Sequence, residues 1–162
     1  MAEPWFKARA DGIGWTPADA RGWTAWVVSG LLLAANFARL ALTASSVEEA
    51  YAVFLPEALG LLLALFWLCL ATGQELPALK GKVWFKAKRF GWGWTPAAPE
   101  GWVVVGLFLA SLLGSTLALV RFRPVPPSPG MVAEHLVLAC VLAASLVGIC
   151  WKTGEKPGWR WG

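Results

Sequence analysis

Four long apolar stretches constrain the fold more than any other feature of this chain. They run over residues 24–43, 51–71, 102–120 and 131–151. Each is close to the roughly 20 residues that a helix needs to cross a bilayer core of about 30 Å. None shows the polar stripe of a soluble amphipathic helix, and in lipid the backbone polar groups must be satisfied within the segment. The sequence therefore predicts an all-α integral membrane protein with four transmembrane helices.

The composition agrees with this class and argues against several others. Apolar residues make up 57% of the 162-residue chain and charged residues 15%, whereas soluble domains have about 45–50% and about 25%. These values argue against a soluble enzyme, a disordered chain and a secreted disulfide scaffold. At this length we expect a single domain over residues 1–162. The three cysteines, Cys69, Cys140 and Cys150, have no C-x-x-C spacing and predict neither a disulfide framework nor a zinc site.

The distribution of positive charge predicts the orientation of the chain in the membrane. Lysines and arginines gather before the first stretch, between the second and third, and after the fourth, whereas the other two loops hold only Arg121 and Arg123. The positive-inside rule then places both termini and the central loop in the cytoplasm. Because these charges already have a topological role, the net charge of +4 does not indicate nucleic-acid binding.

The chain is a tandem repeat. Residues 5–23 and 84–102, which we call the leaders, share 12 of 19 identical positions at an offset of 79. A Cys-x-x-Thr-Gly ending also recurs, at residues 69–73 and 150–154. The repeats therefore cover about 5–79 and 84–162. Since each repeat crosses the membrane twice, we expect two parallel two-helix units related by an axis along the membrane normal.

The leaders combine aromatic and basic residues, which is typical of a membrane interface. The glycines of GIGW and GWGW permit a sharp change of chain direction. The pairs Thr16-Pro17 and Thr95-Pro96 are typical of a helix start, with threonine as N-cap and proline in the first helical position. The first and third helices are thus predicted to begin at these prolines.

The GWGWTP leader and the C-terminal tail KTGEKPGWRWG resemble an uncharacterised family of small bacterial membrane proteins, which carry one such leader and an RWRWG-like tail. This chain resembles a tandem duplication of that pattern, with the full tail only at its C-terminus. The resemblance implies a bacterial inner-membrane location. It carries over no catalytic or binding residues.

The twelve tryptophans all fall in or near the predicted cytoplasmic interface. One interpretation is anchoring in one leaflet. The other is a docking surface, where tryptophans bury against a partner subunit or enclose a lipid head group. The candidate docking rim consists of Trp5, Trp15, Trp84, Trp92, Trp94, Trp159 and Trp161.

The apolar stretches contain three charged residues and the only histidine of the chain. Arg39 and Glu57 each fall roughly 8–9 Å below the outer boundary, where a helical hairpin brings them together. Because either charge alone in lipid is costly, we predict an ion pair between them. Glu134 and His135 begin the fourth stretch, and Glu134 is expected to pair with an arginine of the preceding outer loop. A lone histidine does not predict a metal site.

No nucleophile–base set, phosphate-binding loop or pair of catalytic carboxylates is evident, so neither an enzyme nor a bound cofactor is predicted. The first hypothesis is a scaffold or accessory subunit that docks a partner or another copy through its Trp-rich rim. Its partners would be membrane lipids and a homo-oligomer or larger membrane complex. The alternative is a small oligomeric transporter or channel that uses Arg39, Glu57, Glu134 and His135. A third, weaker hypothesis is a lipid- or quinone-handling enzyme with the rim as its head-group site.

Overall fold

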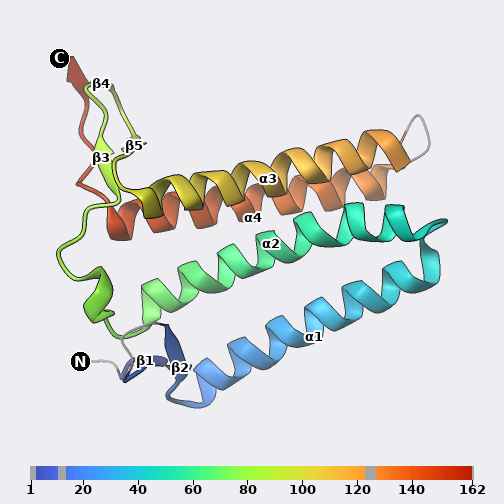
Figure 1. Cartoon of the computed structure of the whole chain (residues 1–162), viewed down its shortest axis with the longest axis horizontal. Helices are drawn as coiled ribbons and strands as arrows, with labels where there is room; N and C mark the ends of the chain where they lie inside the picture. Colours follow the sequence, from blue (N-terminus) through green and yellow to red (C-terminus); the bar gives the residue numbers. More distant parts are fainter. Residues whose placement is uncertain (1–2, 11–13, 123–126, 162) are drawn as a thin grey trace.

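Four long helices occupy the four apolar stretches in the computed structural model, which describes residues 3–10, 14–122 and 127–161. Each helix is long and apolar enough to cross a membrane, so this part of the prediction is confirmed. The two ends of the chain lie at the same end of the helix bundle, which we call the terminal end; the opposite end is the loop end (Figure 1). The helices are α1 (Ala20–Thr43), α2 (Val47–Thr72), α3 (Pro99–Phe122) and α4 (Pro129–Thr153).

The terminal end also contains short strands, which the all-α prediction missed. They form three antiparallel pairs, β1 with β2, β3 with β5, and β4 with β6. A short 3-10 helix, η1 (Pro77–Leu79), lies between the two halves of the chain. The strands are β1 (Phe6–Ala8), β2 (Trp15–Pro17), β3 (Phe85–Ala87), β4 (Phe90–Gly91), β5 (Trp94–Pro96) and β6 (Arg160–Trp161).

The predicted helix starts at the two Thr-Pro pairs are wrong. Thr16 and Pro17 belong to strand β2, where Thr16 lies opposite Lys7 and Pro17 opposite Phe6. Proline is tolerated there, because a residue at the end of a short edge strand need not donate a hydrogen bond to its neighbour strand. The N-cap of α1 is Asp19, whose carboxylate accepts a hydrogen bond from the Gly22 N–H (2.9 Å). That bond, followed by the one from Arg21, lowers the pKa of the Asp19 carboxyl below its ordinary value.

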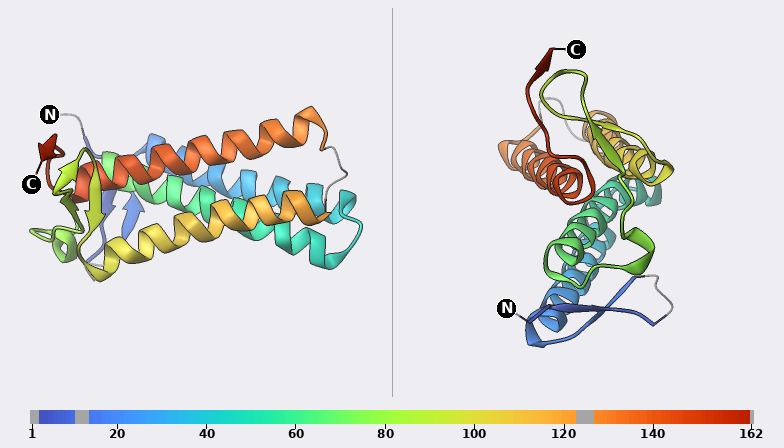
Figure 2. Two further views of the ribbon diagram at one scale, coloured as in Figure 1. Left: turned by 90° about the horizontal axis from the view of Figure 1, so that it is seen from above. Right: turned by 90° about the vertical axis from the view of Figure 1, so that its left-hand side faces the viewer.

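Helix α2 lies at the centre of the bundle and contacts the other three helices. Helices α3 and α4 lie side by side, whereas α1 packs on α2 away from them (Figure 2). The main core is formed by α2, α3, α4 and β3, with Phe85, Leu142 and Ile149 almost completely buried. Helix α1 buries only Gly22 and Leu40. It is therefore held mainly at its two ends.

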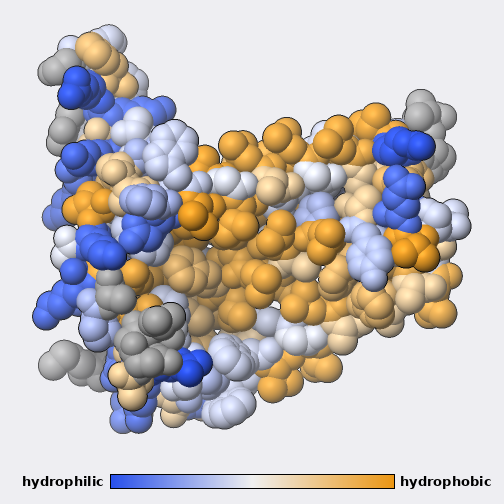
Figure 3. Space-filling view, viewed as in Figure 1, coloured by the Kyte–Doolittle hydropathy of each residue, from blue (hydrophilic) through white to orange (hydrophobic). Residues whose placement is uncertain are grey.

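The surface of the bundle divides into three zones. An apolar belt covers its middle, and hydrophilic residues gather at the two ends, most densely at the terminal end (Figure 3). Large apolar side chains are exposed along all four helices, among them Leu31, Leu55, Leu117 and Val137. A bilayer covers such a belt with hydrocarbon and leaves the hydrophilic ends in water.

Small residues recur every four positions in α1 (Gly30, Ala34, Ala38) and in α3 (Ala110, Gly114, Ala118), and the row in α3 packs inside the chain. In α3, an added Cβ at Gly114 would lie 2.9 Å from Pro56 Cγ of α2, and Ala118 is buried. Ser111 of the same helix donates a hydrogen bond to the carbonyl oxygen of Pro56 (2.5 Å). In α1, by contrast, an added Cβ at Gly30 would meet nothing within 4 Å. Small residues thus allow close approach between α2 and α3, whereas Gly30 of α1 takes no part in such a contact.

Candidate functional site

The first leader closes the terminal end of the α1–α2 hairpin. Its strands β1 and β2 form a hairpin whose Trp5 N–H donates to the Thr72 carbonyl at the end of α2 (3.0 Å). The Gln74 N–H donates in return to the Phe6 carbonyl (2.9 Å). The indole Nε1 of Trp15 donates to the Gln74 carbonyl (2.9 Å). We call this joint of leader hairpin and Thr-Gly ending a latch.

The second leader forms a latch with the same bonds at the end of α4. The Trp84 N–H donates to the Thr153 carbonyl (2.9 Å), and the Glu155 N–H donates to the Phe85 carbonyl (2.9 Å). The indole of Trp94 donates to the Glu155 carbonyl (2.8 Å). The residues that the leaders share, and the two Thr-Gly endings, are therefore the residues that build the latches.

The glycines of the leaders serve backbone geometry and close approach. Gly14, Gly91 and Gly93 have positive φ angles, as their expected role in turns requires. Gly12, in the same predicted turn, lies outside the described residues. A Cβ at Gly101 would lie 2.5 Å from the carbonyl oxygen of Trp84, so only glycine lets α3 start against β3.

The structure divides the candidate docking rim into inner and outer tryptophans. Trp15 and Trp94 are held by their indole hydrogen bonds. Trp84 is only 4% exposed. Trp5 is half-buried, with the Arg21 guanidinium 5.3 Å from its ring centroid. These four side chains join parts of the protein to one another.

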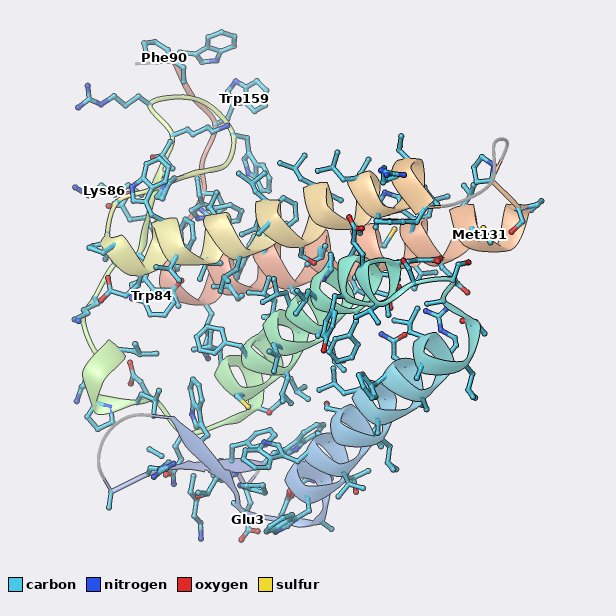
Figure 4. All side chains as sticks on the ribbon, turned by 45° about the vertical axis from the view of Figure 1, so that its right-hand side comes forward. Glu3, Trp84, Lys86, Phe90, Met131 and Trp159 are labelled. Atoms are coloured by element: carbon cyan, nitrogen blue, oxygen red, sulfur yellow. The ribbon has the colours of Figure 1, made fainter. Side chains whose placement is uncertain are left out.

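The remaining three rim residues are exposed, as is Phe90 of the same leader, and the ring of Trp92 lies 5.4 Å from that of Trp94. Trp92, Trp159 and Trp161 have 52%, 67% and 80% of their surface exposed, and Phe90 has 70%. Strand pairing sets Phe90 opposite Trp161, and the rings of Trp159 and Trp161 are 6.0 Å apart. Phe90 on the hairpin and Trp159 on the C-terminal tail beside it both lie beyond the ends of the helices (Figure 4). We call these four residues the aromatic platform.

The repeat pattern of the sequence does not predict Phe90 as part of the rim, although the differences between the leaders point to it. Most of the predicted rim consists of residues that the two leaders share. The platform residues of the second leader, by contrast, occupy positions at which the leaders differ. Phe90 and Trp92 correspond to Asp11 and Ile13 at the 79-residue offset, and those two lie outside the described residues. The platform also needs the C-terminal tail, which occurs once.

The predicted ion pair between Arg39 and Glu57 is confirmed, with 3.4 Å between Arg39 Nη2 and Glu57 Oε2. Asn36 joins the pair from α1: its Nδ2 donates to Glu57 Oε2 (2.6 Å), and its Oδ1 accepts from Arg39 (3.0 Å). Arg39 Nη1 also lies 3.6 Å from Glu134 Oε2 of α4. We call Asn36, Arg39, Glu57 and Glu134 the polar cluster; it ties α1 to α2 and α4 near the loop end.

Glu134 pairs with Arg39 and not with Arg121, which is one of its two expected partners. Helix α4 begins at Pro129, so Glu134 lies more than a turn inside the helix, facing α1 and α2 instead of the loop. The guanidinium of Arg121 stacks over the ring of Phe122 at 5.4 Å. Arg123, the other expected partner, lies outside the described residues.

Behind the polar cluster is a cavity of about 30 Å³, lined by Glu57, Ser115, Glu134 and His135 among others. This volume is about that of one water molecule. The imidazole Nε2 of His135 lies 3.4 Å from Thr116 Oγ1. Over the described ranges, no group of three or more His, Cys, Asp or Glu residues is placed to hold a metal ion.

These features define a mostly helical protein with four apolar helices that could span a membrane, two latches, an exposed aromatic platform and a polar cluster. No protein-family model, curated protein or solved structure matches the chain.

Proposed function

We propose that this protein is a non-enzymatic scaffold or accessory subunit of the bacterial inner membrane, made of two parallel two-helix repeats with both termini in the cytoplasm. It docks another membrane protein through the aromatic platform. The observation that carries this proposal is the exposure of four aromatic side chains, two on the hairpin of the second leader and two on the C-terminal tail that pairs with it. The matching latches support the repeat, and the charge distribution supports the orientation.

The chemistry of the platform suits a protein partner. Tryptophan is enriched among the residues that dominate binding energy at interfaces, where it buries a large surface at little entropic cost. Lys86, Lys88 and Arg89 are exposed on the same leader. Their charge favours a partner surface with acidic residues around an apolar centre, and it gives association a dependence on salt concentration. Of the four buried or half-buried rim tryptophans, Trp84 and Trp94 hold the hairpin of the second leader to the end of α4, beside the platform.

Replacing both Trp159 and Trp161 with alanine is expected to weaken association with the native partner by at least about tenfold, because each truncation of a central aromatic residue typically costs about 2 kcal/mol or more. Association is measured by mild-detergent extraction of native membranes, native gel separation and mass spectrometry of the band that contains this chain. The control is the double replacement of Trp23 and Trp102 with alanine, since both are exposed on the helices away from the platform.

A partner subunit that leaves the band only in the Trp159/Trp161 variant supports the proposal. A band that contains this chain alone, at a defined multiple, would make the partner another copy. If the native band is the same in wild type and in the platform variant, the platform is not a docking surface.

The polar cluster favours a second candidate function, a small transporter or channel. Three helices bring one guanidinium and two carboxylates together within the membrane region, where isolated charges are costly. An open groove of about 560 Å³ between α1, α2 and α4 reaches Arg39, Glu57 and Glu134. The carboxylates and His135 around the small cavity are groups that can carry protons.

A proton path through this cluster predicts a flux that depends on Glu57. Purified protein in liposomes loaded with a pH-sensitive dye should show proton flux above that of protein-free vesicles. Glu57→Gln should reduce this flux at least about tenfold, because the glutamine amide cannot take up and release a proton. Glu48→Gln is the matched control, since Glu48 is exposed at the start of α2 and lines neither the groove nor the cavity. Flux equal to that of empty vesicles excludes this candidate.

A further inference from the structure

The open groove of about 560 Å³ between α1, α2 and α4 changes character along its length. Helices α2 and α4 both begin at the loop end (Figure 1), so residues later in either helix lie deeper in the apolar belt. The lining accordingly runs from a small residue at the loop end, through charged residues, to apolar side chains one to two turns deeper. In that order it includes Gly130, then Glu57 and Glu134, then Leu61 and Val141.

The charges that line this groove do not balance. Two carboxylates, from Glu57 and Glu134, stand against one guanidinium, that of Arg39, so the described residues of the lining leave one negative charge uncompensated. Arg39 lies closer to Glu57 (3.4 Å) than to Glu134 (3.6 Å). The side chain of Glu134 is also the more exposed of the two, at 57% against 27%. The excess negative charge is therefore most accessible at Glu134.

The apolar part of the groove decides what kind of cation suits this charge. An uncompensated carboxylate is costly within the membrane region, and hydrocarbon cannot offset it, whereas a bound cation can. A hydrated inorganic ion would leave Leu61, Val137 and Val141 uncovered. A cation with an apolar body covers these side chains and removes its own apolar surface from water. Charge and lining thus favour the same class of ligand.

We propose that the groove binds an amphiphilic organic cation with a single positive charge. Its charged head lies beside the carboxylate of Glu134, and its apolar body lies along Leu61, Val137 and Val141. An anion would meet the excess negative charge, and a zwitterionic lipid head carries no net charge to offset it. The proposal rests on the site of the second candidate function and names its ligand. Binding is measured without any flux, so the two can fail separately.

The test measures saturable binding of tetraphenylphosphonium, a permanent hydrophobic cation, to the delipidated protein by equilibrium dialysis, with protein-free micelles as the blank. Tetraphenylborate, which has the same shape and the opposite charge, should bind at least about tenfold more weakly. An excess of phosphatidylethanolamine should not displace the cation. Equal binding of the two ions overturns the proposal, and displacement by the phospholipid overturns it in favour of a lipid.

Variants at Glu134 separate its charge from its packing. Glu134→Gln should weaken binding of tetraphenylphosphonium at least about tenfold, whereas Glu134→Asp, which keeps the charge, should weaken it no more than about threefold. Glu48→Gln is the control, because Glu48 is exposed at the start of α2 and lies outside the groove lining. If both Glu134 variants lose binding equally, the site does not recognise charge and the proposal is wrong.

A second pair of variants tests the apolar part of the groove. Val137→Trp fills the groove from a position that is 63% exposed and should abolish binding of the cation. Val120→Trp, which is similarly exposed on α3 but outside the groove lining, should not. If both variants bind as wild type does, the assigned site is wrong. If Val137→Trp instead separates a dimer of this chain and leaves cation binding unchanged, the groove is an interface between copies and the proposal is overturned.

Discussion

Replacing Gly101 with alanine is expected to lower the free energy of unfolding by about 2–4 kcal/mol, although the change adds a single methyl group. The new Cβ would lie 2.5 Å from the carbonyl oxygen of Trp84, and neither backbone can move independently. That carbonyl accepts the Ala97 N–H (2.8 Å), and the Trp84 N–H donates to the Thr153 carbonyl (2.9 Å). Relief of the clash therefore separates β3 from α3 and opens the second latch.

Unfolding in mixed micelles of sodium dodecyl sulfate and a mild detergent measures this effect. Gly106→Ala is the control on the same helix, because a Cβ there meets nothing within 4 Å. It should be neutral or stabilising by up to about 1 kcal/mol, since alanine is the better helix former.

The first repeat provides an independent copy of the same experiment. Gly22 stands against the Trp5 carbonyl as Gly101 stands against that of Trp84, and Gly30 has open space as Gly106 does. Gly22→Ala should destabilise and Gly30→Ala should not. If Gly101→Ala and Gly106→Ala have the same effect, close packing of the latch is not what the leader glycines provide.

The helices could be predicted from the sequence because hydropathy and length report directly on burial in lipid. The predicted stretches lie inside the observed helices, which extend beyond them by one to four residues at each end except the last residue of α1. Polar residues such as Arg21 continue the helix into the interface, where hydropathy gives no signal. The strands could not be predicted, because three-residue strands are stabilised by a helix end that is distant in sequence.

The sites were predicted in part, for a similar reason. Depth along two adjacent helices was enough to pair Arg39 with Glu57, because the short loop between α1 and α2 fixes their register. Glu134 belongs to α4, which is placed beside α2 by side-chain packing in the main core. No pattern in the sequence near Glu134 indicates that packing, so its contact with Arg39 could not be predicted. The leaders were interpreted as a docking rim because their residues repeat. In the structure the repeated residues make the latches, and the exposed platform lies where the repeats diverge.

Arg39 holds together two carboxylates from different helices, so its replacement should have the largest effect near the loop end. Arg39→Met retains an unbranched apolar stem, about as long as arginine from Cβ to Nε, and removes the charged guanidinium. Glu57 and Glu134 are then left without the guanidinium, and α1 loses its link to α4. Breaking a fully buried pair costs about 3–5 kcal/mol. Because the three side chains are 27–57% exposed, we expect about 1–3 kcal/mol.

Removing the carboxylate charges should reverse this loss. In the triple variant with Glu57→Gln and Glu134→Gln added to Arg39→Met, no uncompensated charge remains, and Asn36 can still bond to the new amide at position 57. The unfolding free energy should return to within about 1 kcal/mol of wild type.

Arg121→Met is the control for loss of an arginine near the loop end. Hydrogen exchange should rise in α1 in the single variant and fall again in the triple variant, because α1 buries only two residues and depends on its end contacts. A single variant as stable as Arg121→Met would show that the polar cluster does not hold α1, and the cluster would then be free to serve a path for ions.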